Sequence, residues 1–380
     1  MLRSLLPLLA VLTLTVLAPL AGALAGGASL TELLRLPLTE RAWDALRPSP
    51  LVTLAAWSLM IAVIGAIVWS AHPRARSRRT IETRTPSALP RYTWFGVFAL
   101  IVAIAAVDGG AVNLAAALIT LAVTLFANAD TQRRTGNSLL RQRPGYFYSL
   151  FPASLAVGWA FYWLNLWLQL WTYPAATETV PFLLGKSADY AVLLPALLSL
   201  RQWLASYPLL LAWTTQARPL NGRASPQEGA VLLGLAAVAL VGAPLWPDCI
   251  YPLTLLAPLL LAVGLQQLRD QPTLFAGLAN GDWSRVLLTA VAALLVGLLT
   301  QACNQALGPA WVIELPLIGG PNLLGLPLPA WLWFPALGLF GLWVGDQLTT
   351  PWKQRPQQPQ YRPRFPIKVV VEDLLGKPRR

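Results

Sequence analysis

The chain has 380 residues, of which 56% are hydrophobic and 12% are charged, and its formal net charge at pH 7 is +12. Soluble globular proteins have about 25% charged residues, so this composition excludes an ordinary soluble domain. Several uncharged apolar runs are long enough to cross a hydrocarbon core about 30 Å thick. The composition therefore predicts an all-α fold, a polytopic transmembrane helical bundle of about ten spans.

The first apolar segment, residues 1–26, has two interpretations. Its basic start, its apolar stretch and the sequence Ala23-Leu24-Ala25 also describe a cleavable signal peptide. We expect the segment to be retained as the first span, whereas its cleavage would leave about nine spans. The orientation of the remaining spans is the same in both cases.

The rest of the chain divides into four regions: 27–91, 92–213, 214–347 and 348–380. Residues 27–91 are expected to contain an outer segment, the second span and a basic cytoplasmic loop, and the stretch 29–47 fits a short amphipathic helix on the outer surface. A basic, Pro-rich cytoplasmic tail is expected at 348–380. The spans expected after the first are 51–70, 92–107, 111–128, 147–172, 188–213, 229–246, 251–267, 286–304 and 330–347.

Positive charge is distributed unevenly between the alternating connections of these spans. One class of connection, together with the tail, contains 23 Lys and Arg, whereas the other contains only Arg35, Arg41, Arg47 and Lys186. Because cytoplasmic loops are enriched in Lys and Arg, both termini are expected in the cytoplasm, with the protein in the bacterial cytoplasmic (inner) membrane. Topology then explains the positive charge, and we expect membrane lipids and no nucleic acid as partners.

Two parts of the chain share a pattern of widely spaced residues, which suggests an internal duplication. The pattern is Gly, six residues, Asn, then Trp and, 24 residues later, Pro; the two copies are offset by 139 or 140 residues. It predicts two four-span repeat units, 92–213 and 214–347, that are parallel because both begin inside, with a shared cavity expected at their interface. The matching residues are Gly158, Asn165, Trp171 and Pro195 in the first unit, and Gly297, Asn304, Trp311 and Pro335 in the second.

Polar side chains inside the spans are the first candidates for a binding site. Unpaired polar groups in hydrocarbon cost several kcal/mol, so we expect the amides to point inward. They either form interhelical hydrogen bonds or contact a ligand. The tryptophans at every fourth position from 159 to 171 are either a packing or lipid-facing surface, or a wall for an elongated isoprenoid or lipid chain.

Arg201 is a second candidate, because it is a cation expected near the middle of the span 188–213. A cation there costs at least about 2.5 kcal/mol on insertion scales. It either pairs with carbonyls freed by Pro195 or faces an anionic ligand such as a lipid phosphate. The full set of candidate ligand-binding residues is Arg201, Asn165, Tyr162, Gln169, Gln301, Asn304, Trp171 and Trp311.

The sequence contains few signals of catalysis. No nucleophile elbow, phosphate loop, metal-ligand spacing or His-based general base is present, so no cofactor or metal is expected and the protein is expected not to be an enzyme. An enzyme that uses Tyr, Asp, Glu or Arg stays open. Cys249 and Cys303 lie near the outer ends of their spans, where they either form a disulfide or are two unrelated thiols.

The apolar connections 172–187 and 305–329 are unlike solvated loops. We expect them to lie at the outer leaflet and to cover the region beside Asn165 and Asn304.

One stretch of the second unit resembles a known family. Residues 281–316, with Gly281, Asp282, Trp283, Gly297, Asn304, Trp311 and Pro316, resemble a family of uncharacterised bacterial integral membrane proteins, as does the Pro-Leu-rich stretch 326–339. The resemblance implies an architecture and no activity, and the family's membrane glutamate is replaced here by Gln301 and Tyr162. A more distant likeness is to the lycopene-cyclase domain, whose Pro-x-Glu acids have no counterpart after Pro195 or Pro335.

Three functions fit these patterns. The first is binding or handling of a lipid or isoprenoid-type apolar ligand in a cavity between the repeats. The second is a secondary transporter or channel, favoured by parallel repeats but not by the scarcity of acids in the spans. The third is a non-catalytic assembly subunit, for which the C-terminal tail would be a docking segment.

Overall fold

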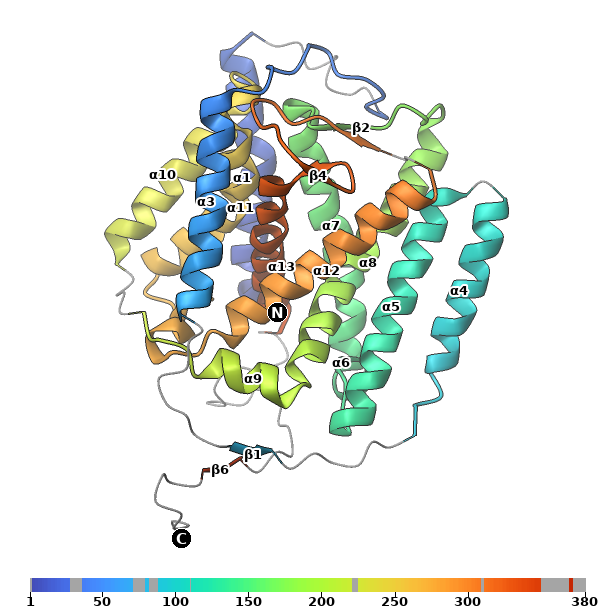
Figure 1. The fold of residues 1–380 in the computed structure, drawn as a ribbon. Helices are drawn as coiled ribbons and strands as arrows, with labels where there is room; N and C mark the ends of the chain where they lie inside the picture. The colour runs from blue at the N-terminus through green and yellow to red at the C-terminus, as the bar shows by residue number, and fades with distance from the viewer. Residues whose placement is uncertain are drawn as a thin grey trace.

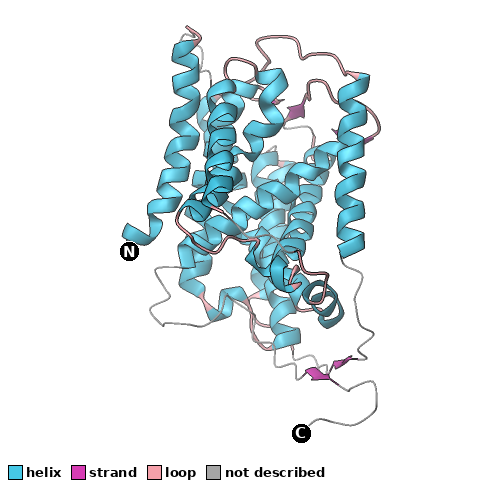
Figure 2. Ribbon diagram, turned by 90° about the vertical axis from the view of Figure 1, so that its left-hand side faces the viewer, coloured by secondary structure: helices cyan, strands magenta, loops and turns pink. Residues whose placement is uncertain are grey.

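The computed structural model describes residues 2–27, 36–70, 79–81, 88–109, 111–220, 225–308, 311–349 and 369–371. Helices dominate this part of the chain, and strands are confined to short pieces (Figure 2). The α-helices are α1 (Leu2–Ala25), α3 (Pro50–Ser70), α4 (Thr93–Asp108), α5 (Val112–Thr135), α6 (Leu139–Gln142), α7 (Pro144–Leu168), α8 (Thr179–Ala205), α9 (Pro208–Thr215), α10 (Pro226–Gly242), α11 (Pro247–Leu268), α12 (Ser284–Ala306) and α13 (Trp333–Thr349).

The remaining elements are short. Two 3₁₀ helices, η1 (Ala276–Asn280) and η2 (Leu328–Leu332), precede α12 and α13. Three antiparallel strand pairs are formed by β1 (Arg79–Ile81) with β6 (Val369–Val371), β2 (Trp171–Thr172) with β3 (Val312–Ile313), and β4 (Asn322–Leu323) with β5 (Leu326–Pro327).

The all-α fold is confirmed, and each of the ten expected apolar segments overlaps a helix. In the described residues, seven helical segments are long and apolar enough to cross a membrane, and α4 and α10 are shorter apolar helices. The seven segments are Leu5–Ala25, Pro50–Ser70, Leu114–Thr135, Thr179–Ala205, Pro247–Leu268, Ser284–Ala306 and Leu328–Thr349.

The helix expected at 188–213 differs most from the structure. It begins nine residues earlier, at Thr179, and ends at Ala205, after which α9 runs in a different direction (Figure 1). Proline has no N–H and disfavours a helical conformation at the residue before it, so Pro208 ends the continuous helix. Tyr207 accordingly has an extended backbone, with φ −91° and ψ 111°.

Two sets of four helices pack in the same pattern. In the first set α4 packs on α5, α5 on α8 and α7 on α8; in the second α10 packs on α11, α11 on α13 and α12 on α13. Contacts between the sets are matched in the same way. The contact of α8 with α12 corresponds to that of α7 with α13, and α7 with α11 corresponds to α5 with α12. The helix α12 runs obliquely across the bundle (Figure 1).

The segment after α1 differs from the expected amphipathic helix. Residues 28–35 lie outside the described residues, and 36–49 form an irregular segment, which we call the outer strap, instead of a helix. The Tyr173 N–H donates to the Leu38 carbonyl at 2.8 Å, and Arg41 forms an ion pair with Asp248 at the start of α11. The strap is therefore held to the bundle by specific contacts and does not lie on the surface as a separate helix.

Candidate ligand-binding cavity

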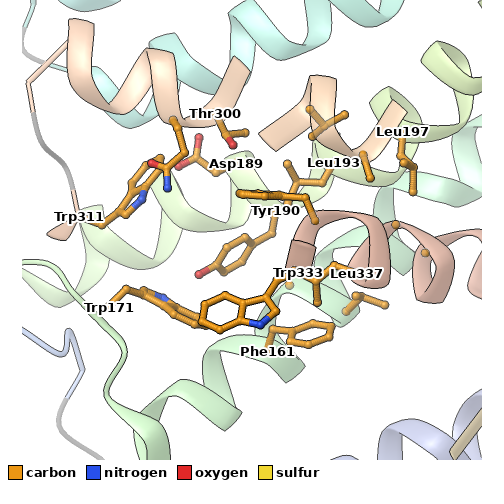
Figure 3. Close-up of a pocket in the computed structure, with 18 of the residues that line it drawn as sticks. Phe161, Trp171, Asp189, Tyr190, Leu193, Leu197, Thr300, Trp311, Trp333 and Leu337 are labelled. Carbon is orange, nitrogen blue, oxygen red and sulfur yellow. The ribbon is translucent and has the colours of Figure 1, made fainter. Parts of the chain in front are cut away.

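A cavity of about 340 Å³ lies between the two sets of helices (Figure 3). Its lining comes from α5, α7 and α8 of the first set and from α11, α12 and α13 of the second. Pockets that bind small molecules have volumes of about 300–1,000 Å³. The cavity is thus large enough for a small ligand or for part of a lipid.

Most of the cavity wall is apolar. Figure 3 shows aromatic and leucine side chains from α7, α8 and α13 around the cavity, among them Phe161, Leu193, Trp333 and Leu337. Apolar walls with a few convergent polar groups are typical of ligand sites, in which the polar groups fix the orientation of the ligand.

The polar part of the lining contains a buried ion pair on α8. Lys186 Nζ donates to Asp189 Oδ2 at 2.8 Å, and the two side chains are 2% and 15% exposed. The same ammonium lies 4.5 Å from the ring centroid of Trp311 and 5.1 Å from that of Tyr173. Pairing with a carboxylate and with ring faces offsets part of the cost of removing the charge from water.

Helix geometry explains this pairing. Since α8 begins at Thr179, Lys186 and Asp189 lie on one face of its second and third turns, three residues apart. The next residue, Tyr190, is held by α7: a Cβ at Gly158 would overlap the Tyr190 ring, so only glycine allows this approach. Ser154 of α7 donates to the Tyr190 carbonyl and accepts from the Leu194 N–H at 2.9 Å.

Two phenols lie beside the ion pair. The hydroxyl oxygens of Tyr173 and Tyr190 are 3.3 Å apart. Tyr173, in the loop after α7, is buried, and burial raises its pKa above the usual range, so that its phenol is neutral at physiological pH. It therefore adds a hydrogen-bonding group to the cavity without adding charge.

Gln301 of α12 is a buried amide in the cavity wall. Its side chain is 3% exposed, and no hydrogen-bond partner within the described ranges is assigned to it. Because the amide lines the cavity and has both a donor and an acceptor, it can form hydrogen bonds with a polar atom of a ligand.

Asn165 and Asn304 have the same structural role in the two sets of helices. The Asn165 amide donates to the Trp171 carbonyl at 2.7 Å and accepts from the Trp171 N–H at 3.1 Å. The Asn304 amide donates to the Trp311 carbonyl at 2.9 Å and accepts from the Trp311 N–H at 3.1 Å. Each asparagine thus fixes the turn that leads from its helix into a short strand and directs the following tryptophan to the cavity.

These turns bring the strands β2 and β3 together beside the cavity. Trp171 is opposite Ile313 and Thr172 is opposite Val312. The connections expected to be lids do line part of the cavity, through residues that include Trp171, Trp311 and Leu326. The first connection is shorter than expected, because residues 179–187 belong to α8.

Three of the eight candidate ligand residues line the cavity, namely Gln301, Trp171 and Trp311. Asn165 and Asn304 instead hold the two turns. Tyr162 and Gln169 hold the outer strap: the Tyr162 hydroxyl accepts from the Leu38 N–H at 3.1 Å, and the Gln169 amide oxygen accepts from the Ala42 N–H at 2.6 Å. Hydrogen bonds within the protein therefore explain these four polar side chains.

The expected mid-span position of Arg201 is wrong, whereas its role as a ligand residue stays a prediction. α8 ends at Ala205, so Arg201 lies near its end and does not line the cavity. It is 15 residues from Lys186, which on a helix is about 22 Å along the axis. Its charge interacts with that of Arg285 on α12, which forms an ion pair with Asp346 on α13.

The tryptophans at 159, 163, 167 and 171 do not form a single wall. Trp159 donates to Ser187 of α8 at 3.1 Å, and Trp163 donates to the Val16 carbonyl of α1 at 3.1 Å. Trp167 is buried at 3% exposure. Of the four tryptophans, only Trp171 lines the cavity.

Of the two alternatives for the cysteines, the structure has two separate thiols and no disulfide between them. Cys249 is an exposed free thiol on the first turn of α11, and Cys303 is a buried free thiol on α12. Within the described ranges, no group of three or more His, Cys, Asp or Glu side chains could hold a metal ion.

The sequence reasoning missed Lys186, Asp189 and Tyr190. Lys186 was counted as a charge of an outer connection because the span was expected to begin at 188. The available signal was the i, i+3 spacing of Lys and Asp directly before a long apolar run.

Comparisons with protein-family models, with curated proteins and with solved structures found no match for this chain. The resemblances noted in the sequence stay predictions, and the chemistry of the cavity carries the functional conclusion.

Proposed function

We propose that this is a polytopic membrane protein that binds a lipid or isoprenoid-type ligand in the cavity between two parallel repeats. The observation that carries the proposal is the cavity itself, about 340 Å³ in volume, with apolar walls and a small group of polar side chains. The apolar wall suits a hydrocarbon chain, and the polar groups suit a head group.

The matched packing of the two sets of helices supports the repeat. Further support comes from the β2–β3 pair. At the offset of 140 residues Thr172 corresponds to Val312, and these two residues lie opposite each other. Self-pairing of equivalent positions is what a local two-fold axis produces. We propose that this axis runs along the membrane normal, because both units begin on the same side.

Orientation follows from the distribution of basic residues. With both termini in the cytoplasm of a bacterial cell, the N-terminal end of α8 faces outward. The Lys186–Asp189 pair then lies in the outer half of the membrane. A ligand chain in the cavity would extend from this polar group toward the bilayer centre.

One observation favours transport by the same site as a second function. Ionisable residues within a membrane segment are uncommon and mark substrate or ion pathways. The Lys186–Asp189 pair lies on such a helix, at a cavity between the proposed repeats, where transporter sites occur. Flux of a bound ligand across the membrane of sealed proteoliposomes would separate transport from simple binding.

The proposed docking tail, 348–380, lies largely outside the described residues.

The test of the binding function is to fill the cavity. We expect Leu193→Trp, in the cavity wall, to lower the affinity for a radiolabelled isoprenoid alcohol such as farnesol at least tenfold. Binding would be measured with purified protein in nanodiscs of zwitterionic lipid. The matched control is Leu184→Trp on the same helix, whose side chain is 69% exposed. Equal affinities of the two variants and the unmodified protein would contradict the proposal.

A further inference from the structure

We infer that the head group of this ligand is uncharged and forms hydrogen bonds, as the hydroxyl or carbonyl of an isoprenoid or fatty alcohol or of a quinone does. The inference rests on the proposed function and adds the chemical class of the ligand. Its basis is the juxtaposition of a self-neutralised ion pair with the Gln301 amide in one apolar cavity.

The charge of the cavity lining is balanced. Lys186 and Asp189 are the only Lys, Arg, Asp or Glu among the described residues that line it, and they pair with each other at 2.8 Å. A net charge brought into apolar surroundings is costly unless it is paired. A phosphate, carboxylate or ammonium head group would therefore bring a charge for which the described lining has no counter-charge.

The ammonium of Lys186 is also poorly available to an anion. Asp189 takes one of its N–H groups, and the rings of Trp311 and Tyr173 lie 4.5 and 5.1 Å from the nitrogen. An anionic head group would have to compete with Asp189 and leave that carboxylate without its partner. Breaking a buried pair by removing one partner is strongly unfavourable.

The lining does offer hydrogen bonds to a neutral head group. The Gln301 amide has both a donor and an acceptor and no assigned partner in the described part of the chain, so it suits a carbonyl as well as a hydroxyl. It follows Thr300 in α12, and both residues line the cavity. Thr300 and Asp189 are drawn on the same side of the cavity (Figure 3). The amide and the ion pair thus belong to one polar region.

The test compares head groups on one chain. Farnesol, farnesyl phosphate and a farnesyl trimethylammonium salt would compete with radiolabelled farnesol for the unmodified protein in zwitterionic nanodiscs. We expect farnesol to bind at least tenfold more tightly than either charged compound. If a charged compound binds as well as farnesol or better, the inference is wrong while the proposed function stands. If none of the three binds, the proposed function fails and the inference fails with it.

Charge variants sharpen the same test. Asp189→Asn leaves a net positive lining and should shift the preference at least tenfold toward farnesyl phosphate. Lys186→Gln leaves a net negative lining and should shift it toward the trimethylammonium compound. The double variant Lys186→Gln/Asp189→Asn is the matched neutral control and should prefer farnesol. Folded single variants that rank the compounds as the unmodified protein does would overturn the inference; if they do not fold, the ranking by the unmodified protein decides it.

Discussion

The two ends of the helix α8 both carry a cation, and they differ in what surrounds it. Near the start, Lys186 lies against an ion-pair partner, two aromatic rings and a cavity. Near the end, Arg201 is half-buried next to Arg285, whose partner is Asp346, and does not line the cavity. A cation in an apolar helix is therefore not a sufficient sign of a binding site. A buried charge that lies beside a cavity, as Lys186 does, is the better indication of a binding site.

The largest expected effect comes from removing the acid that pairs with Lys186. Asp189→Leu leaves Lys186, 2% exposed, without its carboxylate, and losing one partner of a buried pair costs about 3–5 kcal/mol of stability. The double variant Lys186→Met/Asp189→Leu replaces the pair by apolar groups and should recover most of this loss. Chemical denaturation in detergent micelles would measure both. A double variant as unstable as the single one would contradict this account of the pair.

Two close contacts between neighbouring helices, α7 with α8 and α12 with α13, provide a second, smaller test. A Cβ at Gly158 would overlap the ring of Tyr190, and a Cβ at Gly297 would overlap the ring of Phe334. We expect Gly158→Ala and Gly297→Ala each to cost about 1–3 kcal/mol, because overpacking forces side chains or backbone to shift.

The matched control for these variants is Gly234→Ala on α10. A Cβ at Gly234 would meet no atom within 4 Å, and alanine is about 1 kcal/mol better than glycine in a helix. This variant should be neutral or stabilising in thermal unfolding monitored by circular dichroism. Equal destabilisation by all three substitutions would show that the rings beside Gly158 and Gly297 are not the cause.

Composition and hydrophobic runs were sufficient to predict the bundle. Runs of about 20 apolar residues leave few alternatives to helix, so each expected segment is helical in the structure. Helix ends were less predictable. The polar residues Lys186 and Asp189 interrupt the apolar run near the start of α8, and that start was therefore placed nine residues too late. The error hid the buried ion pair and moved Arg201 into an apparent mid-span position.

The candidate site could be predicted only in part, for a different physical reason. Trp171, Trp311 and Gln301 line the cavity. Asn165 and Asn304 instead form hydrogen bonds with the backbone of the turns beside it. A polar residue in an apolar segment shows that a partner must exist. It does not show whether that partner is the backbone, as for Asn165, or is not found among the described residues, as for Gln301. Only the positions of the surrounding groups distinguish the two cases.

The smallest expected effect is at the other end of α8, where Asp346 pairs with Arg285. These side chains are 36% and 19% exposed, so water screens the pair more than it screens Lys186 and Asp189. Ion pairs with access to solvent contribute about 0–1 kcal/mol, and Asp346→Asn should therefore change stability by no more than that and leave farnesol affinity unchanged. The same denaturation and binding measurements apply. A loss as large as that of Asp189→Leu, or an altered affinity, would mean that the two ends of α8 are coupled and that the cavity depends on charges at both.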